Sequence, residues 1–135
     1  MVDRLTPERR SWLMSRVRGK NTTPELIVRK LTHRLGYRFR LHRKDLPGKP
    51  DLVFPVRKKI IFVHGCFWHR HKDCPKATMP KSNVKIWREK FHGNVERDKR
   101  NVTLLENVGW EVMTIWQCET KDIVTLENQL KRFLR

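Results

Sequence analysis

The spacing of apolar and polar residues predicts two helices in the first part of the chain. Thr6-Pro7-Glu8 and Thr23-Pro24-Glu25 each combine an N-cap residue, a first-turn proline and a first-turn carboxylate, so each marks a helix start. The first helix should run through about Val17, and the second should end at Gly36.

Two further helices follow from the same kind of spacing. Apolar residues recur every three or four positions over residues 82–108, and leucines form one stripe over residues 123–134. We expect Gly93 to break or bend the longer helix.

Four short segments have the apolar pattern of strands. Residues 37–41 and 110–116 alternate apolar and polar side chains, residues 52–54 follow a Pro-Gly turn, and residues 59–63 are an apolar run of buried-strand length. The order of elements is then ααβββαβα. It predicts an α/β sandwich around a small mixed sheet, in a single domain over residues 1–135.

The charge of the chain indicates a polyanionic partner. Its 135 residues include 31 Lys and Arg against 14 Asp and Glu, which gives a formal net charge of +17. A domain this basic repels itself unless it meets a polyanion, so nucleic acid is the leading candidate and a solvated basic surface is the alternative. The basic residues are spread along the chain, which indicates a folded binding face.

The cysteine content and the lack of long apolar runs predict a cytoplasmic protein. Three cysteines cannot all pair, and neither a signal peptide nor a transmembrane run is recognisable. We therefore expect reduced thiols and no membrane association. Thiols of this kind are more often metal ligands than bridges.

Residues 63–74 concentrate the side chains that bind metals and move protons. They hold two of the three cysteines and three of the six histidines, beside the aromatics Phe67 and Trp68. Three thiolates and one imidazole make a complete tetrahedral zinc site, here Cys66, His71, Cys74 and the distant Cys118. Such a closed site is structural and would join the loop after the third strand to the end of the last. The alternative is ordinary buried thiols near a surface histidine.

Asp51 is a candidate ligand for a catalytic magnesium ion. It opens a strand after a proline and is followed by a second strand, which is where magnesium nucleases place a carboxylate. The partner strand in the common nuclease pattern carries Glu-x-Lys, but this chain has Phe62-Val63-His64 there. A plain turn residue is therefore the alternative for Asp51.

Three motifs resemble the very-short-patch mismatch repair (Vsr) endonucleases. They are Pro47-Gly48-Lys49-Pro50-Asp51, Phe62-Val63-His64-Gly65-Cys66-Phe67-Trp68-His69 and Asn94-Val95-Glu96-Arg97-Asp98-Lys99-Arg100. The similarity covers essentially the whole chain, since it extends to Met14, Glu25, Gly109-Trp110 and Cys118.

This resemblance implies a restriction-endonuclease-like fold and an enzyme that hydrolyses DNA. Members of the family recognise a T·G mismatch left by deamination of 5-methylcytosine, and they nick the strand 5′ of the mismatched thymine. The resemblance further implies catalytic Mg²⁺, one structural Zn²⁺, double-stranded DNA with a T·G mismatch as the partner, and other mismatch repair proteins acting beside it. One nick needs one active site, so we expect a monomer.

The resemblance also implies roles for individual residues. Asp51 and the backbone carbonyl of Val63 would bind Mg²⁺, and His69 would be the general base, because a histidine imidazole titrates near about pH 6.5. The other catalytic candidates are His64 in the active site, Glu25 at the water shell of the metal and Asp98 as the partner that orients a catalytic histidine. For Glu25, a first-turn carboxylate favoured by the helix dipole is the alternative.

Candidate DNA contacts come from three parts of the chain. The family inserts aromatic side chains as a wedge beside the mismatch, here Phe67, Trp68 and Trp87. Trp87 also fits the apolar stripe of its helix, so core packing is its alternative. Met14 is a candidate minor-groove contact or a helix core residue, and Lys90 and Asn94, one turn apart, are candidate DNA contacts.

Two other functions explain part of this pattern. A non-catalytic, zinc-stabilised DNA-binding module explains the charge and the cysteines, but it leaves Asp51, His64 and His69 without a role. A related nuclease that cuts intact duplex is disfavoured by the aromatic wedge, because cleavage of perfect DNA does not require an intercalating side chain.

Overall fold

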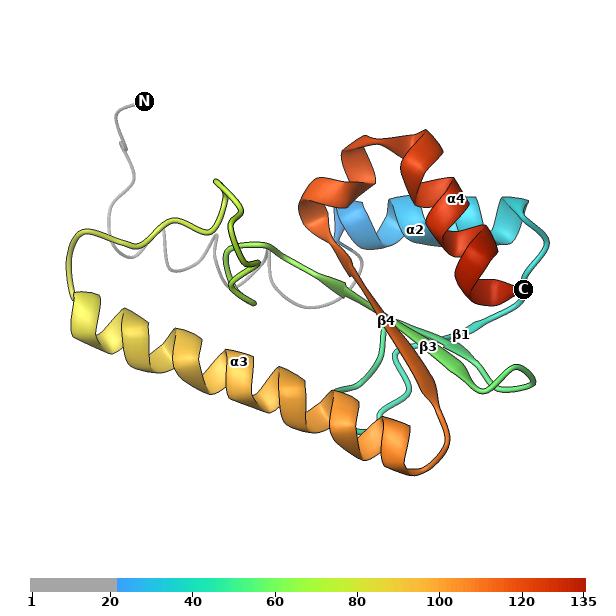
Figure 1. Cartoon of the computed structure of the whole chain (residues 1–135), viewed down its shortest axis with the longest axis horizontal. Helices are drawn as coiled ribbons and strands as arrows, with labels where there is room; N and C mark the ends of the chain where they lie inside the picture. Colours follow the sequence, from blue (N-terminus) through green and yellow to red (C-terminus); the bar gives the residue numbers. More distant parts are fainter. Residues whose placement is uncertain (1–21) are drawn as a thin grey trace.

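A four-stranded mixed sheet forms the centre of the molecule (Figure 1). The computed structural model describes residues 22–135. The strands lie in the order β1-β2-β3-β4 and comprise Arg40–Leu41, Leu52–Phe54, Lys59–His64 and Glu111–Trp116. The β1–β2 and β2–β3 pairs are antiparallel, whereas β3 and β4 are parallel because a helix crosses between them.

Helices cover both faces of this sheet. Helix α2 (Thr23–Arg34) and helix α4 (Ile123–Leu134) lie on one face, and helix α3 (Val84–Asn107) lies on the other (Figure 1). A 3₁₀ helix, η1 (Gln117–Lys121), joins β4 to α4. Within residues 22–135, no helix combines the length and the apolar character needed to cross a lipid bilayer.

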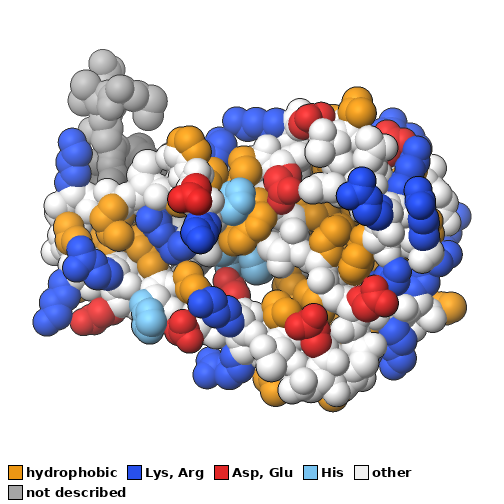
Figure 2. Space-filling view, viewed as in Figure 1, with side chains coloured by type: hydrophobic (Ala, Val, Ile, Leu, Met, Phe, Trp, Pro, Cys, Tyr) orange, Lys and Arg blue, Asp and Glu red, His pale blue; other side chains and the backbone are white. Residues whose placement is uncertain are grey.

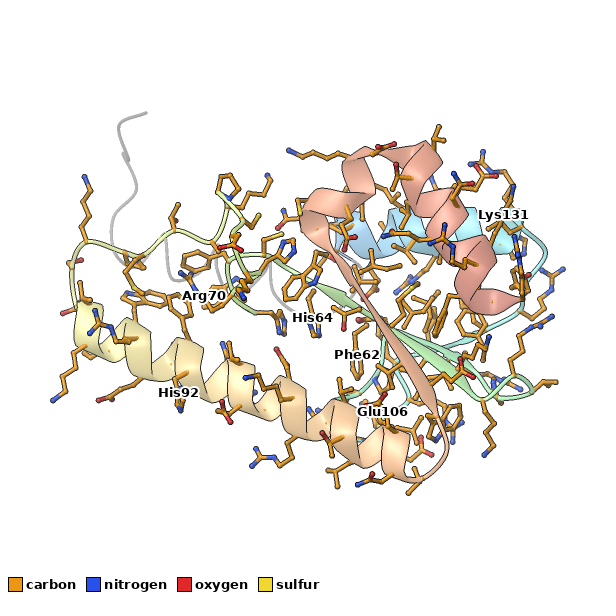
Figure 3. All side chains as sticks on the ribbon, in the orientation of Figure 1. Phe62, His64, Arg70, His92, Glu106 and Lys131 are labelled. Atoms are coloured by element: carbon orange, nitrogen blue, oxygen red, sulfur yellow. The ribbon has the colours of Figure 1, made fainter. Side chains whose placement is uncertain are left out.

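The alternation of strand residues divides the core into two apolar layers. On the side of α2 and α4 the buried residues are Val28, Leu31, Leu52, Phe54, Ile61, Ile115, Leu126, Leu130 and Leu134. On the side of α3 they are Val53, Ile60, Phe62, Leu105 and Trp110. Because successive strand residues face opposite sides, Phe62 and His64 both lie on the α3 side (Figure 3).

Helix α3 reaches well beyond the sheet. Its 24 residues correspond to a length of about 36 Å, and its C-terminal part supplies Leu105 to the core. The N-terminal half projects past the end of β3, where the loop of residues 65–83 runs along it (Figure 1). This arrangement leaves the end of β3 between a loop and a helix, and that is where the polar side chains gather.

The element order predicted from the sequence is confirmed from Thr23 onwards, with differences in detail. The first strand is only Arg40–Leu41, which pairs with Leu52 and Val53 of the short strand β2, and Tyr37 and Phe39 pack against the α2/α4 core. The expected break at Gly93 is wrong, since α3 is continuous there; one mid-helix glycine costs only about 1 kcal/mol. The short helix η1 was not predicted. The predicted first helix, through Val17, lies outside the described residues.

Candidate active site and metal centre

A pocket of about 230 Å³ opens where β3 ends, between the sheet and α3. Figure 3 shows His64 at this point, on the side of the sheet that faces the helix. The turn before β2, the end of β3, the following loop and the middle of α3 all contribute to the wall. The lining residues are Gly48, Lys49, Asp51, Phe62, Val63, His64, His69, Asp98, Asn101 and Val102.

Asp51 is placed in this pocket by the pairing of β2 with β3. Leu52 pairs with Ile61, so the residue before β2 lies beside the end of β3. There the Asp51 Oδ2 atom accepts a hydrogen bond of 2.6 Å from the backbone N–H of Val63. Burial, followed by a hydrogen bond with Glu25, raises the pKa of Asp51 to about 8. Asp51 is therefore a largely buried carboxyl group whose charged form a cation would stabilise.

Glu25 is the buried carboxyl partner of Asp51. Its side chain is only 2% exposed, and it accepts hydrogen bonds from Arg29 and from His42, whose Nε2 atom lies 3.0 Å from Glu25 Oε2. The Thr22 side chain caps the helix by accepting from the backbone N–H of Glu25. Glu25 thus takes the first-turn position that the helix dipole favours and also faces the site.

Sequence reasoning missed His42, which completes this carboxylate cluster. Its Nε2 atom lies 4.0 Å from Asp51 Oδ1, and Glu25, His42 and Asp51 together could hold a metal ion. The backbone N–H of His42 donates to the Asp51 carbonyl at 3.4 Å, which continues the β1–β2 pairing by one residue. The register was the available signal: once Leu41 is paired with Leu52, the next pair is His42 with Asp51.

Within residues 63–74, the two histidines that lie outside the cysteine cluster stack on each other in the pocket. The rings of His64 and His69 are 3.8 Å apart and within 5° of parallel. Burial, together with the neighbouring His69, lowers the pKa of His64 to about 4, so the His64 ring is neutral at pH 7. A neutral ring can stack on a second imidazole whether or not that imidazole carries a proton.

Asp98 of α3 orients the ring of His69. The Nδ1 atom of His69 lies 2.6 Å from Asp98 Oδ2. When Nδ1–H donates to a carboxylate, the lone pair of the neutral imidazole is on Nε2. The His69–Asp98 pair is therefore arranged so that Nε2 can accept a proton.

The four predicted zinc ligands meet in space. The Nδ1 atom of His71 lies 3.6 Å from the Sγ of Cys66 and 3.3 Å from the Sγ of Cys118, and with Cys74 the four ligand atoms lie within 4.8 Å of one another. Metal–sulfur and metal–nitrogen bonds of about 2.3 and 2.0–2.1 Å at a tetrahedral angle would separate such atoms by about 3.6 Å. Loss of solvent contact, followed by the Cys66 thiol, raises the pKa of Cys118 to about 11, so a cation would help these crowded thiols to ionise. The donor set fits a four-coordinate metal ion.

Cys118 reaches this cluster because β4 runs parallel to β3. His64 pairs with Trp116, so the segments that leave the two strands start side by side. Glu119 accepts a 2.8 Å hydrogen bond from the backbone N–H of Trp116 and turns the chain into η1, which carries Cys118. The Trp116 ring stacks on His71 at 4.3 Å and meets His64 edge-on at 5.4 Å. One aromatic ring thus lies between the metal cluster and the pocket.

The three predicted wedge residues form one aromatic cluster along the N-terminal half of α3. The Phe67 ring lies 5.1 Å from Trp68 and 6.0 Å from Trp87, and the two indoles are 5.8 Å apart. Phe91 is the buried member beneath them, at 3% exposure, whereas the other three remain partly exposed. Trp87 packs on this cluster, as its alternative interpretation proposed, and still keeps accessible surface.

Arg70 stabilises the loop that carries these aromatics, and sequence reasoning missed it. Its guanidinium group donates to the carbonyls of Phe67, Ala77 and Thr78, and it lies 4.1 Å above the ring of Phe91 (Figure 3). One arginine among many in a basic chain follows no pattern, so the sequence held no signal for this role.

The remaining DNA-contact candidates differ in their surroundings. The Lys90 ammonium group is exposed and lies 5.4 Å from the Trp87 ring centroid, whereas Asn94 donates to the Trp68 carbonyl at 3.1 Å and so helps to hold the aromatic loop. Met14 lies outside the described residues. Lys and Arg side chains are spread over the face shown in Figure 2, along α3 and around α2 and α4.

Comparison with known proteins adds to this geometry. Residues 2–76 match the family described as DNA mismatch endonuclease Vsr. The chain is 54% identical over 134 residues to the type II nicking enzyme V.XorIIP of Xanthomonas oryzae, which covers 99% of this chain and 98% of that protein. It is 42% identical to the type II nicking enzyme V.NmeAIP of Neisseria meningitidis, over 100% and 96% of the two chains. It is 38% identical to the DNA mismatch endonuclease Vsr of Escherichia coli, over 81% and 69%.

Proposed function

The chain belongs to the Vsr family of DNA endonucleases, and we propose that it recognises T·G mismatches left by deamination of 5-methylcytosine and nicks the strand 5′ of the mismatched thymine. One observation carries this proposal: a single pocket joins the Asp51 carboxyl group to the His69–Asp98 pair. A metal-binding carboxylate and an oriented base are the two parts that hydrolysis of a phosphodiester requires. The sheet that joins them is assigned, within this proposal, to the restriction-endonuclease-like fold.

Asp51 and the Val63 carbonyl are the proposed ligands of a catalytic Mg²⁺ ion. Magnesium prefers oxygen ligands and keeps several waters, and the neighbouring Glu25 carboxylate is close enough to Asp51 to accept hydrogen bonds from such waters. When bound, Mg²⁺ would supply Lewis-acid stabilisation of the phosphate charge. The raised pKa of Asp51 supports this role, because a divalent cation would stabilise the ionised form.

His69 is the proposed general base. Its Nε2 atom takes a proton from the attacking water while Asp98 holds Nδ1–H and stabilises the imidazolium that forms. The water oxygen forms a bond to phosphorus, one P–O ester bond breaks, and the leaving oxygen takes a proton from solvent. His64, neutral and stacked on His69, keeps the ring in place.

Zn²⁺ is the proposed ion of the cysteine cluster, bound by Cys66, His71, Cys74 and Cys118. Four protein ligands leave no open position, so this ion would be structural. It would hold the loop after β3 to η1 and, through Trp116, support the pocket histidines.

Phe67, Trp68 and Trp87 are proposed to enter the duplex beside the mismatch. Unstacking a base step costs a few kcal/mol, and less at a mismatch, so a prearranged aromatic cluster selects mismatched DNA by its deformability. The partial exposure of these rings beside the pocket supports this role.

A nicking assay separates this proposal from its two alternatives. The full-length protein is incubated with T·G and T·A duplexes of the same sequence, with and without Mg²⁺. We expect one nick, in the thymine strand of the T·G duplex, only when Mg²⁺ is present. Equal cleavage of both duplexes would identify a nuclease for intact DNA, and binding without cleavage would identify a DNA-binding module.

Two groups of variants separate chemistry from recognition. Asp51→Ala and His69→Ala should lower nicking by about a hundredfold or more and largely spare mismatch binding, because binding rests on phosphate contacts and the wedge.

Trp68→Ala should weaken binding to T·G DNA far more than binding to T·A DNA, at an unchanged melting temperature. Equal loss on both duplexes would assign the indole to packing rather than to selection.

A further inference from the structure

One wall of the pocket comes from the turn before β2 and from α3. Gly48 and Lys49 both have left-handed backbone conformations, with φ of +78° and +49°, and the Lys49 N–H donates to the Leu46 carbonyl at 3.1 Å. A Cβ on Gly48 would lie 2.9 Å from Asn101 Nδ2. Glycine suits this position because its φ is positive and a Cβ would crowd Asn101 and Phe62, and both Lys49 and Asn101 line the pocket.

The acidic groups of the pocket have partners, whereas these two donors have none among the described residues. Asp51 accepts from the Val63 N–H, and Asp98 pairs with His69. Within residues 22–135, the Lys49 ammonium group forms no ion pair and the Asn101 amide forms no hydrogen bond. Two unused donors among the residues that line the pocket of His69 match an anion that enters the pocket.

Lys49 also supplies a charge that β3 does not. The end of β3 reads Phe62-Val63-His64 and carries no lysine. Among the described residues that line the pocket, Lys49 is the one with a permanent positive charge at neutral pH.

We propose that Lys49 and Asn101 bind the non-bridging oxygens of the scissile phosphate and stabilise the charge that develops on them during attack. This inference rests on the proposed function, since it concerns the phosphodiester that the water deprotonated by His69 attacks. A donor that acts on developing charge raises the rate of the chemical step more than it raises DNA affinity.

The test is single-turnover nicking of a T·G duplex with Mg²⁺, at protein concentrations that saturate the DNA. Lys49→Met should lower the rate of the chemical step by about 10²–10³-fold, and Asn101→Ala should lower it by about tenfold, with much smaller changes in DNA dissociation constant. Lys49→Arg, which keeps the charge, should fall between wild type and Lys49→Met.

Lys58 offers a matched control. It is a lysine in a left-handed conformation (φ +57°), its N–H closes a turn on Pro55, and it lies at the opposite end of β3 from the pocket. Lys58→Met removes the same charge and should nick at the wild-type saturated rate. Lys49→Gly should lose activity like Lys49→Met while keeping the wild-type melting temperature, because glycine accepts the left-handed conformation.

The outcomes are distinguishable. If Lys49→Met keeps more than about a third of the wild-type saturated rate, or loses rate only through weaker binding, the phosphate-binding role is wrong while the nicking function stands. If neither wild type nor Lys58→Met nicks the duplex, the proposed function itself fails, and this inference fails with it.

Discussion

At the scale of single residues, the site depends on charge states that burial sets. His64 is neutral because it is buried beside a second imidazole, and Asp51 resists ionisation because it is buried beside Glu25. Neither state follows from residue type. The same burial that favours the neutral forms creates the affinity of Asp51 for a cation.

The pKa of Asp51 predicts how the stability of the protein without bound Mg²⁺ depends on pH. The pKa of Asp51 is about 8 in the folded protein, against an ordinary value of 3.8 that we take for the unfolded chain. Between these two pH values the unfolded chain has lost a proton that the folded chain keeps. The free energy of unfolding should therefore fall as pH rises from about 4 to about 8, by at most about 1.4 kcal/mol per pH unit from this group. Urea denaturation of the protein in buffer without Mg²⁺ and without chelator, so that the cysteine cluster keeps its metal, measures this change across the pH range.

Asp51→Asn is the control for this pH dependence. Its free energy of unfolding should depend less on pH in the same window, because the titrating group is removed and the shape is kept. Saturating Mg²⁺ should also flatten the wild-type curve, since it stabilises the ionised carboxylate. Parallel curves for wild type and Asp51→Asn would contradict the assignment.

At the scale of elements, the chain after β3 and the chain after β4 act as one unit. Both segments follow parallel strands whose C-terminal ends lie side by side, and the cysteine cluster joins the two segments. Helix α3 packs against the loop after β3 through the contact of Phe91 with Phe67, and it contributes Asp98 to the pocket. Loss of the cluster should therefore disturb both stability and catalysis.

We expect Cys118→Ala to lose zinc and stability together. Metal binding to a closed site contributes directly to folding free energy, so the melting temperature should fall by more than about 5 °C. Elemental analysis should find about one zinc ion per wild-type chain and far less in the variant. A strong chelator should bring wild type to the melting temperature of the variant. A zinc-free wild-type protein, or a variant with an unchanged melting temperature, would rule out the structural zinc site.

Gly93→Ala should stabilise helix α3. A Cβ at Gly93 meets nothing within 4 Å, so alanine removes the glycine cost without a clash. The free energy of unfolding should rise by about 0.5–1 kcal/mol with unchanged nicking, as measured by urea denaturation and the T·G assay. Gly48→Ala is the opposite case, because its Cβ would meet Asn101 and its φ is positive, and it should destabilise. A loss of stability in Gly93→Ala would show that the helix needs the glycine.

At the scale of the whole molecule, a net charge of +17 is spread over the surface, whereas the proposed mismatch selectivity rests on a few aromatic rings. Phosphate attraction acts on any duplex, whereas the aromatic cluster responds to local stacking. Affinity and mismatch selectivity should therefore separate experimentally.

The dependence of affinity on salt measures this separation. Plots of log affinity against log salt concentration should be steep and nearly parallel for T·G and T·A duplexes, because both rest on the same phosphate contacts. Trp68→Ala should keep the slope, and Lys90→Met should reduce its magnitude by about 1 if Lys90 contacts a phosphate. A much steeper slope for T·G DNA would show that mismatch recognition depends on additional ionic contacts.

The local signals of the sequence were sufficient for the order of the predicted helices and strands and for the residues that form the cysteine cluster. Helix starts at Thr-Pro-Glu motifs, alternation in the strands and the ligand types of the cysteine cluster are properties of short segments, and the structure keeps them from Thr23 onwards. The family also followed from contiguous motifs. These features can be predicted from the sequence because each depends on residues that are close together in the chain.

Apart from the pairing of Cys118 with the cysteine cluster, only the tertiary structure decided which residues from different segments lie together. His42 lies beside Asp51 through strand register, Arg70 donates to three carbonyls of its loop, and Gly48 lies close to Asn101 because it has no Cβ. The pKa values of Asp51 and His64 likewise depend on burial by segments far away in the chain. These properties arise from distances between segments, and such distances exist only once both faces of the sheet are packed.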